Sequence, residues 1–201
     1  MSCSLNKRTI YVTDAMYDAV HASASAPLRD AMDLAYLTGQ RPADALRVSE
    51  HDIIEGRLIV TQAKTRQPLR IVIAGKLAVL IERIRTRKAD LNVVIAGLLA
   101  NTNGKRITAS VLRNYFNRAS ELAALTHPDL AESIGAFHFY DLRAKAADDT
   151  NDLRGEQAAS NLLGHDSVKT TQRHYLRRCK VVGSTERILG TRQSAMEALS
   201  D

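Results

Sequence analysis

The chain has 201 residues, of which 45% are hydrophobic, and this length and composition suit one large domain or two small ones. Its 28 Lys and Arg residues exceed its 22 Asp and Glu residues, so the net charge is +6, which is compatible with a polyanionic partner. Trp is absent and only 4% of residues are aromatic, which argues against nucleic-acid binding through a platform of stacked aromatic side chains.

Several classes of site are excluded by the sequence pattern. Cys3 and Cys179 form no ligand-spaced pair, so we expect neither a zinc site nor a disulfide framework, and a cytoplasmic location in a bacterial host fits. No apolar run approaches the roughly 18 residues of a transmembrane helix, and the first stretch, MSCSLNKRTI, lacks the apolar core of a signal peptide. We expect no metal ion and no cofactor.

The expected elements, taken in chain order, are mostly helices with one small sheet. Asp14 is expected to cap the first helix. Strand-like runs over 58–61 and 69–73, with a turn at 55–57, predict a three-stranded antiparallel sheet. The fold class is therefore α+β, mainly α-helical, and the lack of long strands alternating with helices disfavours a doubly wound fold. After a flexible lead-in over 1–9, apolar spacing predicts helices over 15–22, 28–37, a short stretch from Pro42, 76–87, 108–125, 141–150, 155–163 and 167–176.

The stretch LTGQRPADAL, residues 37–46, places an arginine between two helices. Gly39 marks the end of one helix, and Pro42 is tolerated at the start of the next. Arg41 is therefore expected beside the free backbone N–H groups of a helix N-terminus, which is where an anion binds. A solvated turn arginine would give the same pattern, so this stretch alone leaves both interpretations open.

Four further stretches carry polar side chains that could act together with that arginine. Each has an ordinary structural explanation, as a turn lysine, a surface arginine, a helix-capping histidine or a core tyrosine. Together they suit the handling of a phosphodiester without a metal. The stretches are QAKTRQP with Lys64 at a hairpin tip, FHFYDLRAKAA with Arg143 just inside a helix, NLLGHDS with His165 at a helix end, and TTQRHYLRR with Tyr175.

The chemistry of these side chains explains why they belong together. Two arginines can hold both non-bridging oxygens of a phosphate and stabilise the charge that develops in the transition state. A tyrosine hydroxyl, with a pKa of about 10, needs nearby cations and a base such as histidine to lose its proton. A lysine on a hairpin can protonate the leaving sugar oxygen. The phosphotyrosine that forms keeps the bond energy, so a second hydroxyl can reseal the strand without ATP.

From residue 28 to residue 178 these stretches resemble the tyrosine recombinases, also called the phage integrase family. LTGQRPADALRVSEHDI resembles the first arginine box of that family, with Arg41 as the catalytic arginine and Asp44 where the family usually has a supporting Glu. The other stretches resemble the remaining motifs, and the resemblance implies that they complete the catalytic set: QAKT with Lys64, DLRAKAA with Arg143, LLGHDS with His165 and TTQRHY with Tyr175.

Two positions depart from the family pattern. The second arginine box is usually His-x-x-Arg, and this chain has Tyr140 where that histidine would lie. Either Tyr140 takes the position with altered acid–base behaviour, or His138 swings in from the preceding turn; spacing at a helix start favours Tyr140. The interval from His165 to Tyr175 is one residue longer than usual, and the usual interval would end at His174. We expect Tyr175 to be the nucleophile, with His174 either polarising the site or solvated.

The resemblance implies a site-specific DNA recombinase that cleaves and rejoins strands through a 3'-phosphotyrosyl intermediate, without metal or ATP. Its expected partner is double-stranded DNA, bound by a homotetramer, with no membrane association. One alternative is a type IB topoisomerase, which relaxes a strand without exchange. Another is a DNA-binding relative that has lost catalysis, which the tyrosine at position 140 favours. An RNA-binding module is disfavoured, because the sequence has no stacking motif or glycine clamp.

The resemblance also implies how the chain is divided. Residues 10–180 would form the catalytic domain. Full-length members carry an N-terminal DNA-clamping domain, for which the residues before the first motif leave no room, so we expect an excised domain or a short natural member. The tail over 181–201 has apolar periodicity, and it would pack either into a neighbouring copy or on its own domain.

Overall fold

The computed structural model describes residues 10–63, 66 and 68–178 of the chain. The predicted lead-in, the hairpin lysine Lys64 and the predicted C-terminal tail lie outside these residues. The described part consists mainly of helices with one small sheet, so the predicted fold class is confirmed.

Helix α1 (Asp14–Ala22) is capped by Thr13, the residue before the expected cap. Thr13 has the extended backbone of a capping residue, and its Oγ1 accepts a hydrogen bond from the backbone N of Met16 at 3.2 Å. The prediction that Asp14 caps this helix is therefore wrong. Asp14 lies in the first turn instead, where its negative charge interacts favourably with the helix dipole.

Helices α2 (Ala26–Thr38) and α3 (Pro42–Ala45) meet at the sharp turn that the sequence predicted. α2 ends at Gly39, whose φ of 64° lies in the left-handed region that favours glycine. α3 starts at a proline, which suits the first turn because its missing N–H has no helical partner there. Arg41 is the capping residue of α3, so its backbone is fixed between two helix ends.

The sheet is antiparallel with the strand order β1-β2-β3, as predicted. Its strands are β1 (Ile53–Ile54), β2 (Arg57–Thr61) and β3 (Pro68–Val72). On β2, Leu58 and Val60 are buried while the residues between and beside them are more exposed, which is the alternation of a strand with one covered face. The strand leads directly into the hairpin that contains the predicted lysine.

The middle of the chain supplies three more α-helices, of which the last was not predicted. They are α4 (Lys76–Asp90), α5 (Ala109–Thr126) and α6 (Ala131–Ala136). Short 3-10 turns, also not predicted, are η1 (Glu50–Asp52), η2 (Pro128–Leu130) and η3 (Phe139–Asp141). On α5, Leu112, Phe116 and Ala119 are buried, whereas Val111 and Tyr115 are half-buried.

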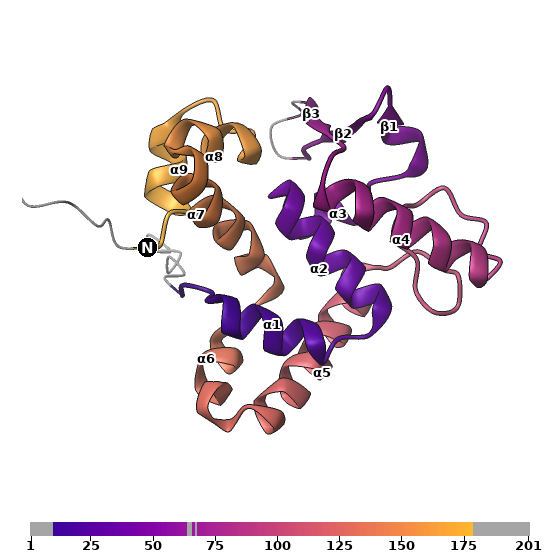
Figure 1. Cartoon of the computed structure of the whole chain (residues 1–201), viewed down its shortest axis with the longest axis horizontal. Helices are drawn as coiled ribbons and strands as arrows, with labels where there is room; N and C mark the ends of the chain where they lie inside the picture. The colour runs from indigo at the N-terminus through magenta and orange to yellow at the C-terminus, as the bar shows by residue number, and fades with distance from the viewer. Residues whose placement is uncertain (1–9, 64–65, 67, 179–201) are drawn as a thin grey trace, which may run out of the picture.

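The last three helices pack on one another and carry most of the candidate site. They are α7 (Leu142–Arg154), α8 (Glu156–Leu163) and α9 (Val168–His174). The predicted helix over 167–176 ends two residues early, so Tyr175 lies just beyond α9 with φ of −123°. Figure 1 shows these helices lying together, with α2 between α7 and α4.

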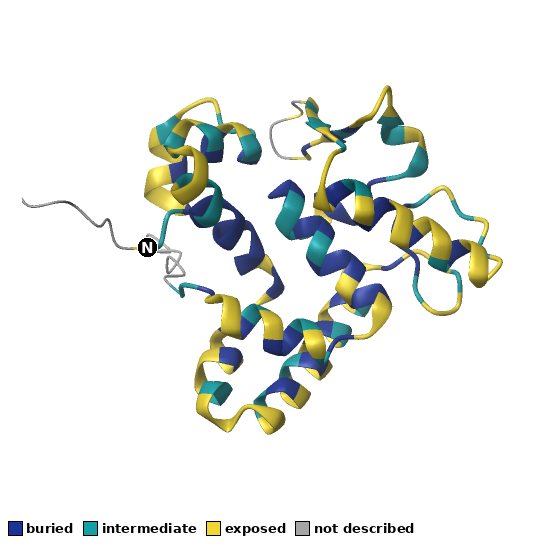
Figure 2. Cartoon of the chain, in the orientation of Figure 1, coloured by how far each residue is buried: buried dark blue, intermediate teal, exposed yellow. Residues whose placement is uncertain are grey.

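Two groups of buried apolar side chains stabilise the described part. The larger extends from Val12 to Leu142 through α1 to α5 and the sheet, whereas the smaller contains Ala144, Ala147, Leu163 and Tyr175. Figure 2 shows buried residues on the facing sides of α2 and α7. Among the described residues, no helix is long and apolar enough to cross a membrane.

Candidate active site

Arg41 is held at the start of α3 by polar neighbours and leaves part of its side chain accessible. Its side chain is 18% exposed, and its Nη1 donates to Gln62 Oε1 at 3.3 Å. The same Nη1 lies 3.8 Å from Asp44 Oδ2, so a carboxylate stands behind the guanidinium. The charge of Arg41 is therefore fixed in place by groups that leave its outer edge available to an anion.

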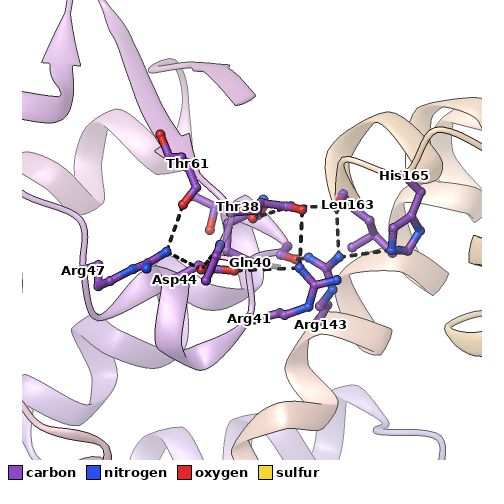
Figure 3. Close-up of polar contacts among 12 residues, drawn as sticks. Thr38, Gln40, Arg41, Asp44, Arg47, Thr61, Arg143, Leu163 and His165 are labelled. Atoms are coloured by element: carbon purple, nitrogen blue, oxygen red, sulfur yellow. Dashed lines mark hydrogen bonds and ion pairs between the residues drawn. The ribbon is translucent and has the colours of Figure 1, made fainter. Parts of the chain in front are cut away.

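Asp44 has a wider role than supporting one arginine. It is 2% exposed, and its Oδ1 accepts from Arg47 Nη2 at 2.7 Å and from the backbone N of Ala63 at 3.0 Å. Arg47 in turn donates to the carbonyl oxygen of Thr61 at 2.9 Å. Figure 3 shows this chain of contacts from α3 to the end of β2. Asp44 therefore joins the arginine-bearing turn to the strand that leads into the hairpin.

Arg143 is the most buried charged group of the site. It is 1% exposed, and it donates to the carbonyl oxygens of Gly39 at 2.5 Å and Leu163 at 2.9 Å. Its Nη2 also lies 3.2 Å from His165 Nε2. Burial lowers the pKa of this guanidinium, but a guanidinium remains charged at neutral pH. The bonds to Gly39 and Leu163 orient this charge at the junction of α2 and α8, beside Arg41 in Figure 3.

His165 follows Gly164, the left-handed residue that ends α8. Its Nδ1 lies 2.8 Å from Thr171 Oγ1, and its Nε2 faces the Arg143 donor. Burial, followed by the charges of Arg143 and Arg41, lowers the pKa of His165 to about 4. The ring is therefore neutral at pH 7, with Nε2 accepting from the arginine and Nδ1–H donating to the threonine.

Tyr175 packs against the side chains of Arg143 and His165. It is 8% exposed, its ring centroid lies 5.0 Å from that of His165, and Arg143 Cζ lies 5.0 Å from the tyrosine ring. Burial alone would raise the pKa of the Tyr175 hydroxyl, but a hydrogen bond from Tyr140 and the charges of Arg143 and Arg41 lower it below its usual value. This environment favours the phenolate, which is the nucleophilic form.

The two tyrosines of the site contact each other through their hydroxyl groups. The oxygens of Tyr140 and Tyr175 lie 3.1 Å apart, and Tyr140 is 40% exposed on η3. Burial and then the contact with Tyr175 raise the pKa of Tyr140, whereas that of Tyr175 is lowered. Either hydroxyl can donate while both are protonated, and the direction of these shifts favours Tyr175 as the first to lose its proton, with Tyr140 then donating to it.

His138 and His174 take no part in this contact. The Nδ1 of His138 lies 3.0 Å from the carbonyl oxygen of Ala136, at the start of η3, so of the two alternatives the structure brings Tyr140 to Tyr175. His174 is exposed on α9, although its charge contributes to lowering the pKa of His165. Lys64 lies outside the described residues. Within the described ranges, no three or more His, Cys, Asp or Glu side chains gather as a metal site would require.

Sequence reasoning missed a pair of buried glutamines between the arginines. Gln62 donates to Gln40 Oε1 at 2.9 Å and to the carbonyl oxygen of Leu163 at 2.8 Å, while its own Oε1 accepts from Arg41. Leu163 therefore binds both Gln62 and Arg143. A signal was present, because Gln62 continues the inward positions of Leu58 and Val60 on β2, where a polar side chain needs a partner.

A mainly helical domain with a small antiparallel sheet and a cluster of two arginines, a histidine and a buried tyrosine is typical of the catalytic domain of a tyrosine recombinase. The model of the phage integrase family matches residues 10–180, and the chain belongs to that family. The family membership predicted from the sequence motifs is therefore confirmed.

Individual relatives agree with this assignment. The integrase of Escherichia phage lambda is 27% identical over 165 residues, which cover 80% of this chain and 45% of that protein. The integrase of Escherichia phage HK022 is 28% identical over 163 residues, which cover 77% of this chain and 43% of that protein. This chain therefore spans less than half the length of these curated relatives.

Solved structures show the same fold. A lambda integrase dimer bound to a COC' core site has a TM-score of 0.70 at 24% identity, covering 92% of this chain and 66% of that one. The lambda integrase catalytic core has a TM-score of 0.61 at 25% identity, covering 78% of this chain and 91% of that one. XerA recombinase has a TM-score of 0.60 at 19% identity, covering 83% of this chain and 60% of that one.

Proposed function

We propose that this chain is a site-specific DNA recombinase that cleaves and rejoins strands through a 3'-phosphotyrosyl bond to Tyr175. The single observation that carries the proposal is the setting of the Tyr175 hydroxyl. It is buried against Arg143 and His165, and it lies 3.1 Å from the Tyr140 hydroxyl. A core tyrosine with a purely structural role has no need of two arginines, Arg143 and Arg41, whose charges lower its pKa.

Arg41 and Arg143 would bind the phosphate that is attacked. Both guanidinium groups come from the junction between α2, α3 and α7, and both contact the glutamine–carbonyl network around Leu163. A phosphodiester carries one negative charge, and the pentacoordinate transition state carries more. Two fixed arginines therefore bind the transition state more tightly than the ground state, which is the condition for catalysis.

Tyr175 would then attack the phosphorus atom. Its oxygen forms the new bond to phosphorus as the bond to the sugar 5'-oxygen breaks, and Tyr140 stabilises the developing phenolate by donating a hydrogen bond. His165 is neutral, and its Nε2, which faces Arg143 in the chain without DNA, would accept the tyrosine proton. We propose Lys64 as the donor of the proton that the leaving 5'-oxygen takes up. Attack by a 5'-hydroxyl on the phosphotyrosine reverses these steps and rejoins the strand.

The proposal includes duplex DNA as the substrate and four copies of the chain as the active assembly, working in the cytoplasm. Structures of lambda integrase as a dimer bound to a COC' core site and as a tetramer bound to a Holliday junction support this part of the proposal. The net charge of +6 is consistent with binding to a polyanion. Since phosphate contacts would supply most of the affinity, we expect DNA binding to weaken steeply with salt.

Covalent trapping tests the proposal. Duplexes that bind the protein are selected from a random pool, and a nick is placed so that the short strand released by cleavage diffuses away. We expect a denaturation-resistant protein–DNA band for the unmodified chain and none for Tyr175→Phe, with equal gel shifts for both. Bound DNA without a covalent band would instead support the DNA-binding relative. A covalent band accompanied by relaxed circles and no Holliday junctions would support the topoisomerase alternative.

A further inference from the structure

The backbone that follows Tyr175 is tied to a carboxylate on helix α7. Asp148 is 2% exposed, and its Oδ1 accepts from the backbone N of Arg177 at 2.8 Å and from that of Arg178 at 3.3 Å. These two amides come directly after the end of α9, where no helical partner continues. A single buried carboxylate therefore supplies the hydrogen bonds that fix the backbone after Tyr175, where those of the helix have ended.

The side chain of Arg177 forms a second set of bonds, at the start of α7. Its Nη1 donates to Asp141 Oδ1 at 2.9 Å and to the carbonyl oxygen of Ile10 at 2.7 Å. The Arg177 side chain is 5% exposed and that of Asp141 is 0% exposed, so the pair is withdrawn from water. In such an environment breaking a charge pair is costly in free energy, because it leaves a buried charge without its partner.

Asp141 connects this set of bonds to the other tyrosine. Its Oδ2 accepts from the backbone N of His138 at 2.8 Å and so caps η3, the turn that contains Tyr140. The same carboxylate therefore fixes the turn that presents the Tyr140 hydroxyl and, through Arg177, the segment that presents the Tyr175 hydroxyl. The two segments joined by this link are those that meet at the 3.1 Å contact between the two hydroxyls.

The spacing of the two carboxylates on α7 gives the link its geometry. Asp141 and Asp148 are seven residues apart, which is about two helical turns, so they lie on the same face of the helix. Arg143, on the first turn of α7, has its own contact with the Tyr175 ring. Two points of α7, its capping residue Asp141 and Asp148 in its middle, thus bind the segment that follows Tyr175, while Arg143 in its first turn contacts the tyrosine ring.

We propose that Asp141, Asp148 and Arg177 form a nucleophile clamp that positions Tyr175 against Tyr140 and Arg143 of the same chain before DNA binds. The inference rests on the proposed function, because it names the residues that position its nucleophile. The clamp residues are positioning residues and touch neither the phosphate nor the attacking oxygen. A displacement of the hydroxyl by about 1 Å is enough to slow an in-line attack by about two orders of magnitude.

The test measures the pKa of Tyr175 without requiring any activity. The phenolate absorbance of each protein is titrated, and the curve of its Tyr175→Phe counterpart is subtracted, so that the four of the six tyrosines outside the contact between Tyr140 and Tyr175 cancel. The groups that act on the hydroxyl are Tyr140, Arg143 and Arg41, and His165 packs against the ring. If the clamp holds Tyr175 among them, Arg177→Met raises the pKa of Tyr175 toward its ordinary value of about 10.

A matched control separates positioning from loss of a buried ion pair. Arg87 in α4 also binds a buried carboxylate, Asp30 at 2.7 Å, and a backbone carbonyl, Ala100 at 3.2 Å, but it lies away from the tyrosines. We expect Arg87→Met to leave the pKa of Tyr175 unchanged. Equal pKa values for Tyr175 in the unmodified chain, in Arg177→Met and in Arg87→Met would overturn the proposal.

A second pair of variants keeps the test decisive if Arg177→Met fails to fold. Asp148→Asn retains an oxygen that can accept from the two amides, whereas Asp148→Ala removes it. We expect Asp148→Ala to raise the pKa of Tyr175 and to slow covalent trapping at least about tenfold with unchanged DNA binding, and Asp148→Asn to do neither. Equal behaviour of the two variants would contradict the clamp. If the trapping rate and the pKa of Tyr175 are the same in the variants as in the unmodified chain, the clamp is contradicted but the proposed function is not. If the pKa of Tyr175 shifts in the variants but the unmodified chain forms no covalent band, only the proposed function is contradicted.

Discussion

The two halves of the molecule are stabilised in different ways. The half formed by α1 to α5 and the sheet surrounds a large apolar core, whereas α7 to α9 surround a small cluster in which Tyr175 is itself a member. Arg41 comes from the first half, and Arg143, His165 and Tyr175 come from the second. The site therefore lies where a well-packed half meets one with little apolar packing of its own.

This difference shows where the precision of the site originates. Apolar contacts are non-directional and tolerate small shifts, so the first half mainly supplies a stable surface. In the second half the positions depend on directional bonds, such as those from Arg143 to Gly39 and Leu163. We therefore expect substitutions of polar groups in the second half to affect the reaction far more than comparable changes in the first.

The largest effect is expected from removing an arginine of the site. Arg143→Ala and Arg41→Ala should each slow covalent trapping about 10²- to 10³-fold, because each removes a fixed charge from the transition state. Gel shifts on the same duplex should change little. The control is Arg85→Ala, since Arg85 is 42% exposed and pairs with carboxylates in the first half. Trapping at the normal rate by either site variant would contradict the assignment.

The contact between the two halves can be tested through two glycines. Gly164 and Gly75 both have positive φ, 65° and 53°, but a β-carbon at Gly164 would lie 2.8 Å from Leu69 Cδ1 and 2.9 Å from Gln62 Nε2, while at Gly75 it meets no atom within 4 Å. Backbone strain should cost each alanine variant about 1–2 kcal/mol. Gly164→Ala should lose about 1–3 kcal/mol more because it overpacks the junction. Urea unfolding measures this, and equal losses would show that the junction is loosely packed.

A smaller effect is expected at the contact between the tyrosine hydroxyls. Tyr140→Phe removes the donor to Tyr175 and should slow trapping by about tenfold, as expected for loss of one hydrogen bond to a charged group. Tyr140→His restores a donor at that position and should not reduce activity. A loss with histidine as large as that with phenylalanine would mean that the phenol of Tyr140 has a role of its own.

The smallest effect is a change in how stability depends on pH. The pKa of His165 is lowered to about 4 in the folded chain, while that of an unfolded histidine is about 6.5. Between these values the unfolded chain binds a proton that the folded chain does not, so this histidine makes stability fall as the pH falls from about 6.5 to 4. His165→Gln should reduce that loss in urea unfolding curves, and His174→Gln, which changes an exposed histidine, should not. Parallel curves for all three proteins would contradict a buried neutral His165.

Much of the fold could be predicted because local signals and tertiary structure agree. Gly39 and Pro42 mark the break between α2 and α3, and the alternation of Leu58 and Val60 marks β2. The cap of α1 was misplaced because Thr13 and Asp14 are both good capping residues, and only the backbone conformation decides between them. The short α6 was missed because six residues give too little periodicity for a helix to be recognised.

For the site, the motifs predicted the arginines, the histidine and the tyrosine that the structure brings together, but not the groups that orient them. Arg143 depends on the carbonyl oxygens of Gly39 and Leu163, and any residue type could supply a carbonyl. Thr171, which binds His165, lies in a helix whose face cannot be deduced from so short a segment. Arg177 follows Tyr175 among other basic residues, and nothing in that stretch indicates its buried partner Asp141. Contacts across the fold therefore had to come from the structure.

The measurement that tests the account most directly is to identify the atom that carries the DNA. The trapped complex is digested with nuclease and trypsin, and the nucleotide-bearing peptide is fragmented in a mass spectrometer. Trypsin separates the candidates, because Tyr140 lies in the peptide 119–143 and Tyr175 in the peptide 174–177. The account predicts the nucleotide on the phenol oxygen of Tyr175. A nucleotide on Tyr140, 3.1 Å away, or on His174 would contradict it.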